Sequence, residues 1–128
     1  MNSDEAIPTI SDAEWEVMKV LWDTPGLNAP EVHARLQDRR TWKIRTVQTL
    51  LGRLVQKGAL GFEKNGREYL YHPLFDAETC RRAASNSFIT RVFDGRLAPF
   101  LATFVESTEL SAEEIDELKR LLDEGQEK

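Results

Sequence analysis

The sequence predicts a mainly α-helical fold with one small β-hairpin, and three observations support this prediction. Apolar residues recur at helical spacing through most of the chain. The period changes to two only between residues 60 and 73, around the dipeptide Asn65-Gly66. Two capping-box signatures, Ser11 to Glu14 and Ser111 to Glu114, mark helix starts.

Length and composition restrict the chain to one domain or two small ones. Its 128 residues are 41% hydrophobic and 30% charged, which is typical of globular proteins. Residues 1–10 contain no apolar leader segment, and no apolar run approaches the ~18 residues that span a bilayer. We therefore expect a cytoplasmic protein that makes no use of a membrane. The single cysteine, Cys80, cannot form an internal disulfide or a site of several thiolates, so no metal or other cofactor is expected.

The net charge of −5 conceals a strong segregation along the chain. Residues 35–67 carry nine basic side chains against two acidic ones, whereas residues 1–34 and 106–128 each have a net charge of −6. A concentrated cationic block in an acidic chain indicates a face that meets a polyanion. A solvated charged face is the alternative that charge alone leaves open.

Two helices are expected first. The first runs from the Ser11 cap to the break at Thr24-Pro25-Gly26, and its inward residues are Val17, Met18, Leu21 and Trp22. The second is capped by Asn28, tolerates Pro30 in its first turn and ends by Arg39-Arg40, with Val32 and Leu36 inward.

A third helix is expected from about Lys43 to Lys57, with Gly58 just past its end. One face holds the apolar residues Ile44, Val47, Leu51 and Leu54. The other holds a polar stripe of Arg45, Thr46, Thr49 and Arg53, which Gln56 extends. Threonine combines a hydroxyl with a methyl that can pack on thymine, and the arginine fork matches guanine O6 and N7. The stripe therefore suits a DNA major groove, although an ordinary exposed face remains the alternative.

A β-hairpin is expected over Leu60 to His72, with Asn65-Gly66 as a type I′ turn and two basic residues, Lys64 and Arg67, flanking its tip. Three helices followed by such a hairpin predict a winged helix-turn-helix domain over residues 1–75, whose third helix binds DNA. Protection of an exposed hairpin edge is the other reading of Lys64 and Arg67.

Residues 76–128 predict three further helices. Asp76 caps a helix that reaches about Phe93, with an inward set of Cys80, Ala84, Phe88 and Val92. After the Asp94-Gly95 break, a short segment carries an unusually wide apolar face of Leu97, Phe100, Leu101, Phe104 and Val105. The last helix begins after Ser111, ends before Gly125, and turns Ile115, Leu118 and Leu122 inward.

About 50 residues with such wide apolar faces make a poor free-standing domain. We expect them to pair with the same region of a second chain, which would give a two-fold dimer suited to a palindromic site. The expected dimerisation residues are Phe88, Val92, Leu97, Phe100, Leu101, Phe104, Ile115, Leu118 and Leu122. Packing of these helices on the first domain is the alternative.

Four segments carry a resemblance to a known family. They are Ile10–Trp22, Thr46–Gly58, Phe88–Phe93 and Leu110–Leu118. Together they resemble the penicillinase-repressor family, the BlaI/MecI/CopY type, over roughly Ile10 to Asp123. The resemblance implies a dimeric winged-helix repressor that binds a palindromic operator near TACA/TGTA and blocks transcription, often of antibiotic-resistance genes.

The resemblance also assigns roles to the polar stripe. Thr46, Thr49 and Arg53 occupy the places where the family's recognition helix contacts DNA, and Arg45 is the basic residue before them. We expect Thr49 and Arg53 to meet base edges, and Arg45 and Thr46 to meet phosphates or sugars. The expected backbone contacts are Lys43, Lys64 and Arg67.

The sequence departs from the family pattern in two places. Antibiotic-responsive members are inactivated by cleavage of an Asn-Phe bond, but this chain has Thr103-Phe104 there. A sensor protease as partner is therefore an open expectation, with Thr103-Phe104 as the bond it would cut. The copper-responsive branch carries a C-terminal cysteine pair that this sequence does not have, so copper sensing through that pair is not expected.

No catalytic constellation is expected, and the chain is not predicted to be an enzyme. The two histidines, His33 and His72, lack partners at metal-ligand spacing and are read as surface or capping residues. The rival hypothesis is a winged-helix module that binds protein and has lost DNA binding. The pairing of Thr46 and Thr49 with Arg53 inside the cationic block argues against it.

Overall fold

The first three helices begin within one residue of the predicted positions, and the second ends at Leu36, ahead of the predicted Arg39-Arg40. The computed structural model describes residues 7–126. Helix α2 spans Asp12–Asp23, and Ser11 and Glu14 form a complete capping box at its start. Helix α3 spans Ala29–Leu36, with a second capping box between Asn28 and Glu31. Helix α4 spans Ile44–Lys57 and ends at Gly58, whose φ of 87° is readily adopted only without a side chain.

The chain divides into two compact units, residues 1–86 and 87–128. Helix α5, Ala77–Phe93, crosses this division. The hairpin ends before it, so the functional boundary proposed at 75/76 lies eleven residues ahead of the structural division. The first turns of α5, which include the buried Cys80, therefore belong with the first unit.

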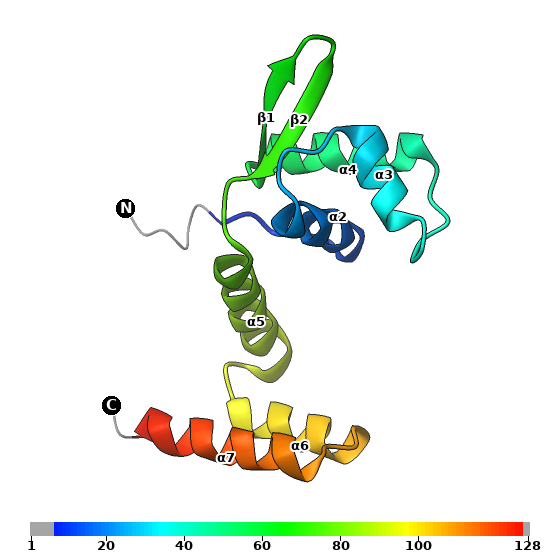
Figure 1. Cartoon of the computed structure of the whole chain (residues 1–128). Coiled ribbons are helices and arrows are strands. Elements are labelled where there is room, and N and C mark those ends of the chain that lie inside the picture. Colours follow the sequence, from blue (N-terminus) through cyan, green and yellow to red (C-terminus); the bar gives the residue numbers. More distant parts are fainter. Residues whose placement is uncertain (1–6, 127–128) are drawn as a thin grey trace. The chain divides into compact units, whose positions relative to one another are not determined.

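The core of the first unit lies where α2, α3, α4 and the hairpin meet (Figure 1). It consists of aliphatic side chains from all of these elements together with the chain between them: Val17, Met18, Leu21, Leu27, Val32, Leu36, Val47, Leu50, Leu51, Leu54, Ala59 and Leu60. Every one is less than one-tenth exposed. The predicted inward faces of the first three helices are thus confirmed, apart from Ile44 and Trp22, which are only partly buried.

The wing is an antiparallel hairpin of β1, Leu60–Asn65, and β2, Glu68–Pro73. Its turn differs from the prediction. The two loop residues are Gly66 and Arg67, and Asn65 belongs to the strand, where it pairs with Glu68. Gly66 has a φ of 68° and Arg67 does not have a positive φ, which is the pattern of a type II′ turn.

A like-charge conflict explains why the predicted turn was wrong by one residue. A turn centred on Asn65-Gly66 would place Lys64 opposite Arg67 and Glu63 opposite Glu68, and like charges in directly opposed positions are unfavourable. The observed register instead pairs Lys64 with Tyr69 and Glu63 with Leu70.

Two long-range contacts fix the wing and the start of α5. The Tyr71 N–H donates to the Leu27 carbonyl at 2.9 Å, and the Gly26 N–H donates to the Tyr71 carbonyl at 2.8 Å. This bridge ties β2 to the chain between α2 and α3. The Trp22 indole N–H donates to the Phe75 carbonyl at 2.9 Å, just ahead of α5.

An ion pair between the buried Glu14 and the partly exposed Lys57 joins the start of α2 to the end of α4. Glu14, which is 1% exposed, accepts from Lys57 Nζ at 2.5 Å, and the same ammonium donates to the Thr9 carbonyl at 2.9 Å. Burial alone would raise the pKa of Glu14. Hydrogen bonds from Lys57 and the Ser11 amide outweigh it and hold the pKa below 4.5. The last turn of α4 is therefore anchored to the first turn of α2.

The second unit contains the end of α5, helix α6 over Leu97–Ser107, and helix α7 over Ala112–Gln126. Asp76 Oδ1 accepts from the Thr79 amide at 2.7 Å, which confirms the predicted cap of α5. Helix α7 passes Gly125, contrary to the prediction, because that glycine does not take a positive φ and is tolerated as a helical residue.

The inward faces expected for the last three helices are not buried within this chain. Cys80 is buried, but Ala84, Phe88 and Val92 are exposed, and so are Ile115, Leu118 and Leu122. No residue from 87 to 125 is buried. Three helices alone give these side chains too little to pack against. Among the described residues, no helix is long and apolar enough to cross a membrane.

We predict that Lys57→Met lowers the free energy of unfolding at pH 7 by about 1–3 kcal/mol, because it leaves the Glu14 carboxylate buried without its cation. The folded-state pKa of Glu14 is depressed, so the stability from this pair is present above pH 4.5 and is lost as the pH falls through the folded pKa. Denaturant titrations at pH 7 and in acid measure both effects. Lys43→Met, which removes an exposed ammonium, is the control. Equal free energies of unfolding for Lys57→Met and Lys43→Met at pH 7 would contradict the claim that the Glu14–Lys57 ion pair anchors α4 to α2.

Candidate nucleic-acid interface

The outward face of α4 consists of the residues that the core does not use. Val47, Leu50, Leu51 and Leu54 are buried, and they set the direction in which the helix faces inward. Arg45, Thr46, Thr49 and Arg53 are all exposed, as their spacing predicts. Gln48, Gly52 and Gln56 are exposed as well. The outward face is therefore wider than the predicted stripe, and no acidic residue occurs in α4.

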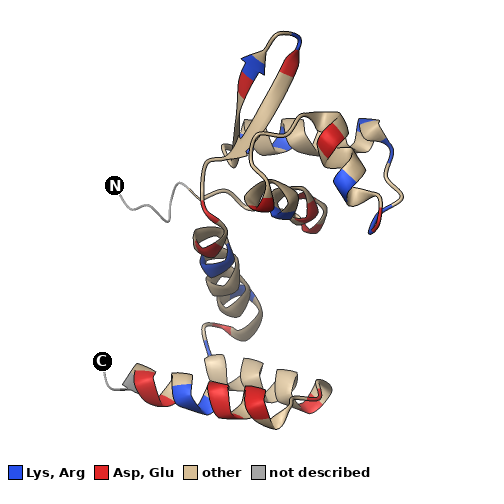
Figure 2. Ribbon diagram, in the orientation of Figure 1, with Lys and Arg blue, Asp and Glu red and all other residues tan. Residues whose placement is uncertain are grey.

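The basic side chains of this face have no acidic partner. Several other cations of the first unit are paired with acids: Arg35 lies 3.6 Å from Asp23, and Arg39 and Lys19 lie 3.9 and 3.5 Å from Glu16. Among the described residues, no salt bridge involves the cations of the candidate interface, namely Lys43, Arg45, Arg53, Lys64 and Arg67. Figure 2 shows how acidic and basic segments are distributed over the ribbon. Within residues 7–126, the cations of the outward edge of α4 and of the wing tip are thus left without a salt-bridge partner.

Thr49 is held in one orientation by its own helix. Its hydroxyl donates to the Arg45 carbonyl at 3.0 Å, which uses its only hydrogen. The oxygen can still accept a hydrogen bond, and the methyl group remains free. The chemistry left to Thr49 is acceptance from an amino group or apolar contact, as with a thymine methyl.

The loop that leads into α4 is fixed by aromatic and histidine contacts. His33 Nε2 lies 2.7 Å from the Trp42 carbonyl, so this ring nitrogen carries the hydrogen that it donates. The Arg40 guanidinium lies 5.4 Å from the centre of the Trp42 ring. Since the ring also packs against the core, Lys43 at the start of α4 has a defined position. His33 is a capping residue of this loop.

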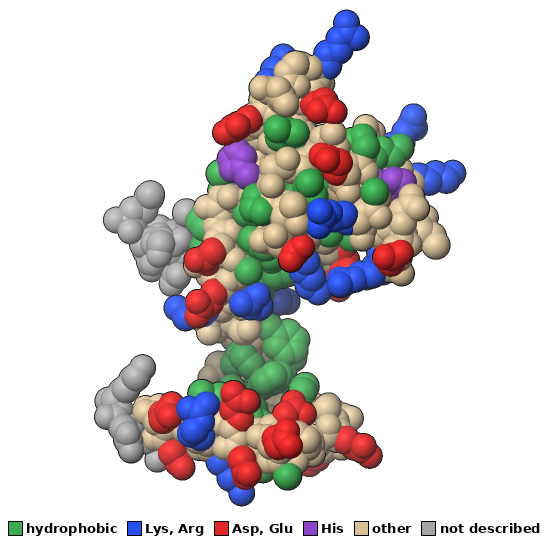
Figure 3. Space-filling view, viewed as in Figure 1, with side chains coloured by type: hydrophobic (Ala, Val, Ile, Leu, Met, Phe, Trp, Pro, Cys, Tyr) green, Lys and Arg blue, Asp and Glu red, His purple; other side chains and the backbone are tan. Residues whose placement is uncertain are grey.

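The wing presents its two basic residues at or next to its tip. Arg67 is in the turn, and Lys64 lies two residues before the turn, with Nζ 6.0 Å from the Tyr69 ring. Figure 3 shows Lys and Arg side chains projecting at this end of the hairpin. The Phe62 and Tyr69 rings lie nearby with their centres 4.6 Å apart and their planes tilted by 50°, although each side chain is more than 40% exposed.

A groove of about 290 Å³ lies between α4, the start of α3 and the wing. Its lining includes Gln48 and Tyr69, which are not among the DNA-binding residues predicted from the sequence. The signal for Gln48 was available, because the four core positions of α4 already define which residues point outward. The position of Tyr69 at the groove could be predicted only from the correct hairpin register, and the sequence predicted a different register.

The surroundings of His72 and Cys80, the other side chains capable of acid-base or nucleophilic chemistry, favour a structural role for both. His72 lies opposite Gly61, where a β-carbon would come within 3.0 Å of its ring. Burial, reinforced by the Asp76 carboxylate, raises the pKa of the Cys80 thiol and disfavours the reactive thiolate.

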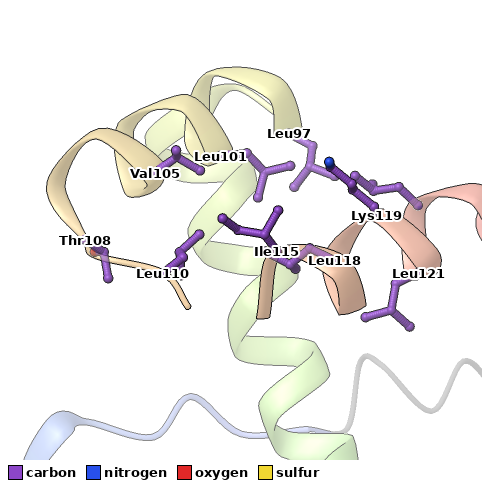
Figure 4. Close-up of a pocket in the computed structure, with 10 residues that line it drawn as sticks. Leu97, Leu101, Val105, Thr108, Leu110, Ile115, Leu118, Lys119 and Leu121 are labelled. Carbon is purple, nitrogen blue, oxygen red and sulfur yellow. The ribbon is translucent and has the colours of Figure 1, made fainter. Parts of the chain in front are cut away.

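The second unit has an apolar groove of about 630 Å³, and five of the nine predicted dimerisation residues line it: Leu97, Leu101, Ile115, Leu118 and Leu122. Figure 4 shows Leu97, Leu101 and Val105 of α6 facing Ile115 and Leu118 of α7 across it. Phe88, Phe93, Phe100 and Phe104 form a chain of ring contacts 5.5–6.3 Å apart. The bond Thr103-Phe104 lies inside α6, where the Thr103 hydroxyl donates to the Pro99 carbonyl at 3.0 Å.

The three-helix core, the hairpin and the cationic edge of α4 define a winged helix-turn-helix protein. Comparison with known proteins narrows this class. The model of the penicillinase repressor family matches residues 10–124. The penicillinase repressor of Bacillus licheniformis is 44% identical over 118 residues, which cover 92% of each chain. The methicillin resistance regulatory protein MecI of Mammaliicoccus sciuri is 34% identical over 113 residues, covering 88% of this chain and 92% of that one.

Solved structures agree with these relatives. The DNA-binding domain of the repressor BlaI is 48% identical, with a TM-score of 0.52, and the match covers 57% of this chain and 89% of that one. The monomeric form of Bacillus licheniformis BlaI in complex with the blaP half-operator gives the same identity and coverage, with a TM-score of 0.50. The chain therefore belongs to the penicillinase repressor family, and the resemblance expected from its sequence is confirmed.

Proposed function

We propose that this protein is a dimeric transcriptional repressor whose two α4 helices enter successive major grooves of a palindromic operator. The observation that carries the proposal is the uncompensated edge of α4, where Arg45 and Arg53 flank exposed threonine side chains and no acid intervenes. A relative that is 48% identical was solved on a half-operator, which supports duplex DNA as the partner. A protein acting on this target works in the cytoplasm.

Within this proposal, the contacts divide by chemistry. Thr49 and Arg53 meet base edges, because the free methyl and the planar fork can discriminate between bases. Arg45 and Thr46 meet phosphates or sugars. Lys43, Lys64 and Arg67 neutralise the backbone and supply affinity without sequence preference.

The second unit supports the dimer. Residues 87–125 contain no buried side chain, although they include thirteen leucine, isoleucine, valine and phenylalanine residues on three helices. Such apolar surface is stabilised by burial against another surface, and a second copy is the partner that also explains a two-fold operator.

Release from DNA is proposed to follow cleavage by a sensor protease at Thr103-Phe104. Proteases bind extended backbone, so a bond inside α6 must first be exposed by local unwinding. Because α6 contributes Leu97, Leu101 and Val105 to the apolar groove, cutting it would also remove part of the dimer surface.

We predict that Arg53→Ala reduces sequence discrimination, whereas Lys64→Ala weakens binding to every sequence. If Arg53 is bidentate to a base, its loss costs about 1–3 kcal/mol on an operator duplex and little on a scrambled duplex. Loss of Lys64 should lower the slope of log affinity against log salt by about 1 on both. Fluorescence anisotropy at two salt concentrations, with an operator selected from random duplexes by the wild-type chain, measures both effects.

The matched control for both variants is Arg82→Ala, which removes an exposed arginine already paired with Glu78. Unchanged operator preference in Arg53→Ala would overturn the base-reading role. Weak, salt-insensitive binding by the wild-type chain would favour the module that binds protein and not DNA.

We predict that Leu122→Lys converts the dimer to monomers, because it places an ammonium in the apolar groove of the second unit. Sedimentation equilibrium measures the change, and binding to a palindrome should fall further than binding to a half-site. Ala102→Lys introduces the same charge at an exposed position of α6 outside the groove lining, and should remain dimeric. A dimer that survives Leu122→Lys excludes this surface.

We predict that exposure of the native host to a β-lactam yields two fragments, ending at Thr103 and beginning at Phe104. Mass spectrometry of the recovered protein identifies the bond. Phe104→Ala should abolish the fragments and Val105→Ala should retain them, since only the former alters the residue after the bond. An intact wild-type chain after induction rules out release by this route.

A further inference from the structure

The groove between α4 and the wing has an assortment of side chains that neither the core nor the predicted stripe explains. It is lined by residues from three elements: Asn28, Ala29 and Pro30 at the start of α3, Gln48 of α4, and Arg67, Glu68, Tyr69 and Tyr71 of the wing. All of them belong to the first unit. Its volume of about 290 Å³ is at the lower limit for a ligand site, which is suited to one nucleotide unit and not to a large ligand.

Three of the side chains that line this groove, those of Gln48, Arg67 and Tyr69, carry hydrogen-bond donors and have no hydrogen-bond or salt-bridge partner among residues 7–126. The Gln48 amide and the Tyr69 hydroxyl make no hydrogen bond to any described residue, and both side chains are exposed. The Arg67 guanidinium has no acidic partner within the described part of the chain. Amide, phenol and guanidinium groups are all used to hold phosphate oxygens.

The other walls of the groove are apolar. Pro30 and Ala29 contribute aliphatic surface, and Tyr71 contributes its ring. A ligand that fits therefore alternates a carbon-rich part with an anionic, acceptor-rich part. The sugar-phosphate backbone of a nucleic acid has this composition.

The position of Gln48 on α4 favours backbone over base. Consecutive residues of a helix are separated by about 100°, so Gln48 is displaced by that angle from Thr49, and it lies on the side of the wing. A helix that fills a major groove has its front against the bases and its flanks against the two backbones. Gln48 is on such a flank.

One acid opposes this role. Glu68 lines the groove, and its carboxylate accepts from Asn28 Nδ2 at 2.8 Å. It offsets the charge of the neighbouring Arg67, so the groove attracts a phosphate through hydrogen bonds more than through net charge.

We propose that this groove holds one sugar-phosphate segment of the DNA strand that passes between α4 and the wing, with Gln48 and Tyr69 donating to the phosphate. The inference rests on the proposed function and extends it to residues outside the predicted stripe. The groove would thereby fix the spacing between recognition helix and wing on the duplex.

The test is a set of three variants of the full chain, titrated against the selected operator and a scrambled duplex. Gln48→Ala and Tyr69→Phe should each weaken binding about two- to tenfold, by the same factor on both duplexes. The salt slope should stay unchanged, because neither side chain is charged. Glu68→Gln keeps the partner of Asn28 and removes the opposing charge, so it should tighten binding to both duplexes roughly two- to fivefold. Glu78→Gln, which removes an acid paired with Arg82 on α5, is the control for net charge.

A scan of the operator with single methylphosphonate groups locates the contact. One position should weaken wild-type binding and have no further effect in Gln48→Ala. Loss of discrimination between the duplexes in Gln48→Ala would overturn the proposal in favour of a base contact, and an unchanged affinity in all three variants would exclude the groove. If the wild-type chain binds its operator and Arg53→Ala weakens that binding, either of these two outcomes refutes the role of the groove and leaves the proposed function intact. If the wild-type chain binds no duplex, the proposed function fails first.

Discussion

The burial of the aliphatic underside of α4 is the constraint on which the rest of the first unit depends. Val47, Leu50, Leu51 and Leu54 pack against α2 and α3, and this packing determines which residues the helix presents to solvent. The ion pair of Lys57 with Glu14 fixes the end of the helix, and the contact of His33 with Trp42 fixes the loop before it. The outward edge is therefore held rigid before any partner arrives, which lowers the entropic penalty of recognition.

The cations at this edge differ from those on α2 and α3 in their pairing with acidic residues. Cations on α2 and α3 have acids within 4 Å, whereas those of α4's outward edge and the wing tip have none among the described residues. An acidic chain can remain soluble and still offer one strongly cationic face. The second unit has an apolar groove in place of a charged edge, so the two units offer chemically different surfaces.

The sequence predicted the helices of the first unit well because their signals are local: a capping box at Ser11, an asparagine cap at Asn28, a glycine stop and inward residues at helical spacing. The predicted hairpin turn was wrong by one residue. The Asn65-Gly66 dipeptide favours a turn at that position, but the resulting register would place side chains of like charge opposite each other across the two strands. The sequence analysis missed the Glu14 and Lys57 pair, whose members are 43 residues apart. Of the candidate site, the stripe on α4 was predictable, but the groove around Gln48 required the position of the wing. The inward faces predicted for the last helices are exposed, because three short helices alone give these side chains too little to pack against.

The central claim is that the outward edge of α4 is the surface that meets DNA. Nuclear magnetic resonance of the ¹⁵N-labelled chain, titrated with its selected operator, tests it residue by residue. The account predicts that the largest shifts fall on backbone amides from Arg45 to Arg53 and from Lys64 to Arg67, with Lys19 on α2 unaffected. Shifts confined to α6 and α7, with α4 unchanged, would contradict it.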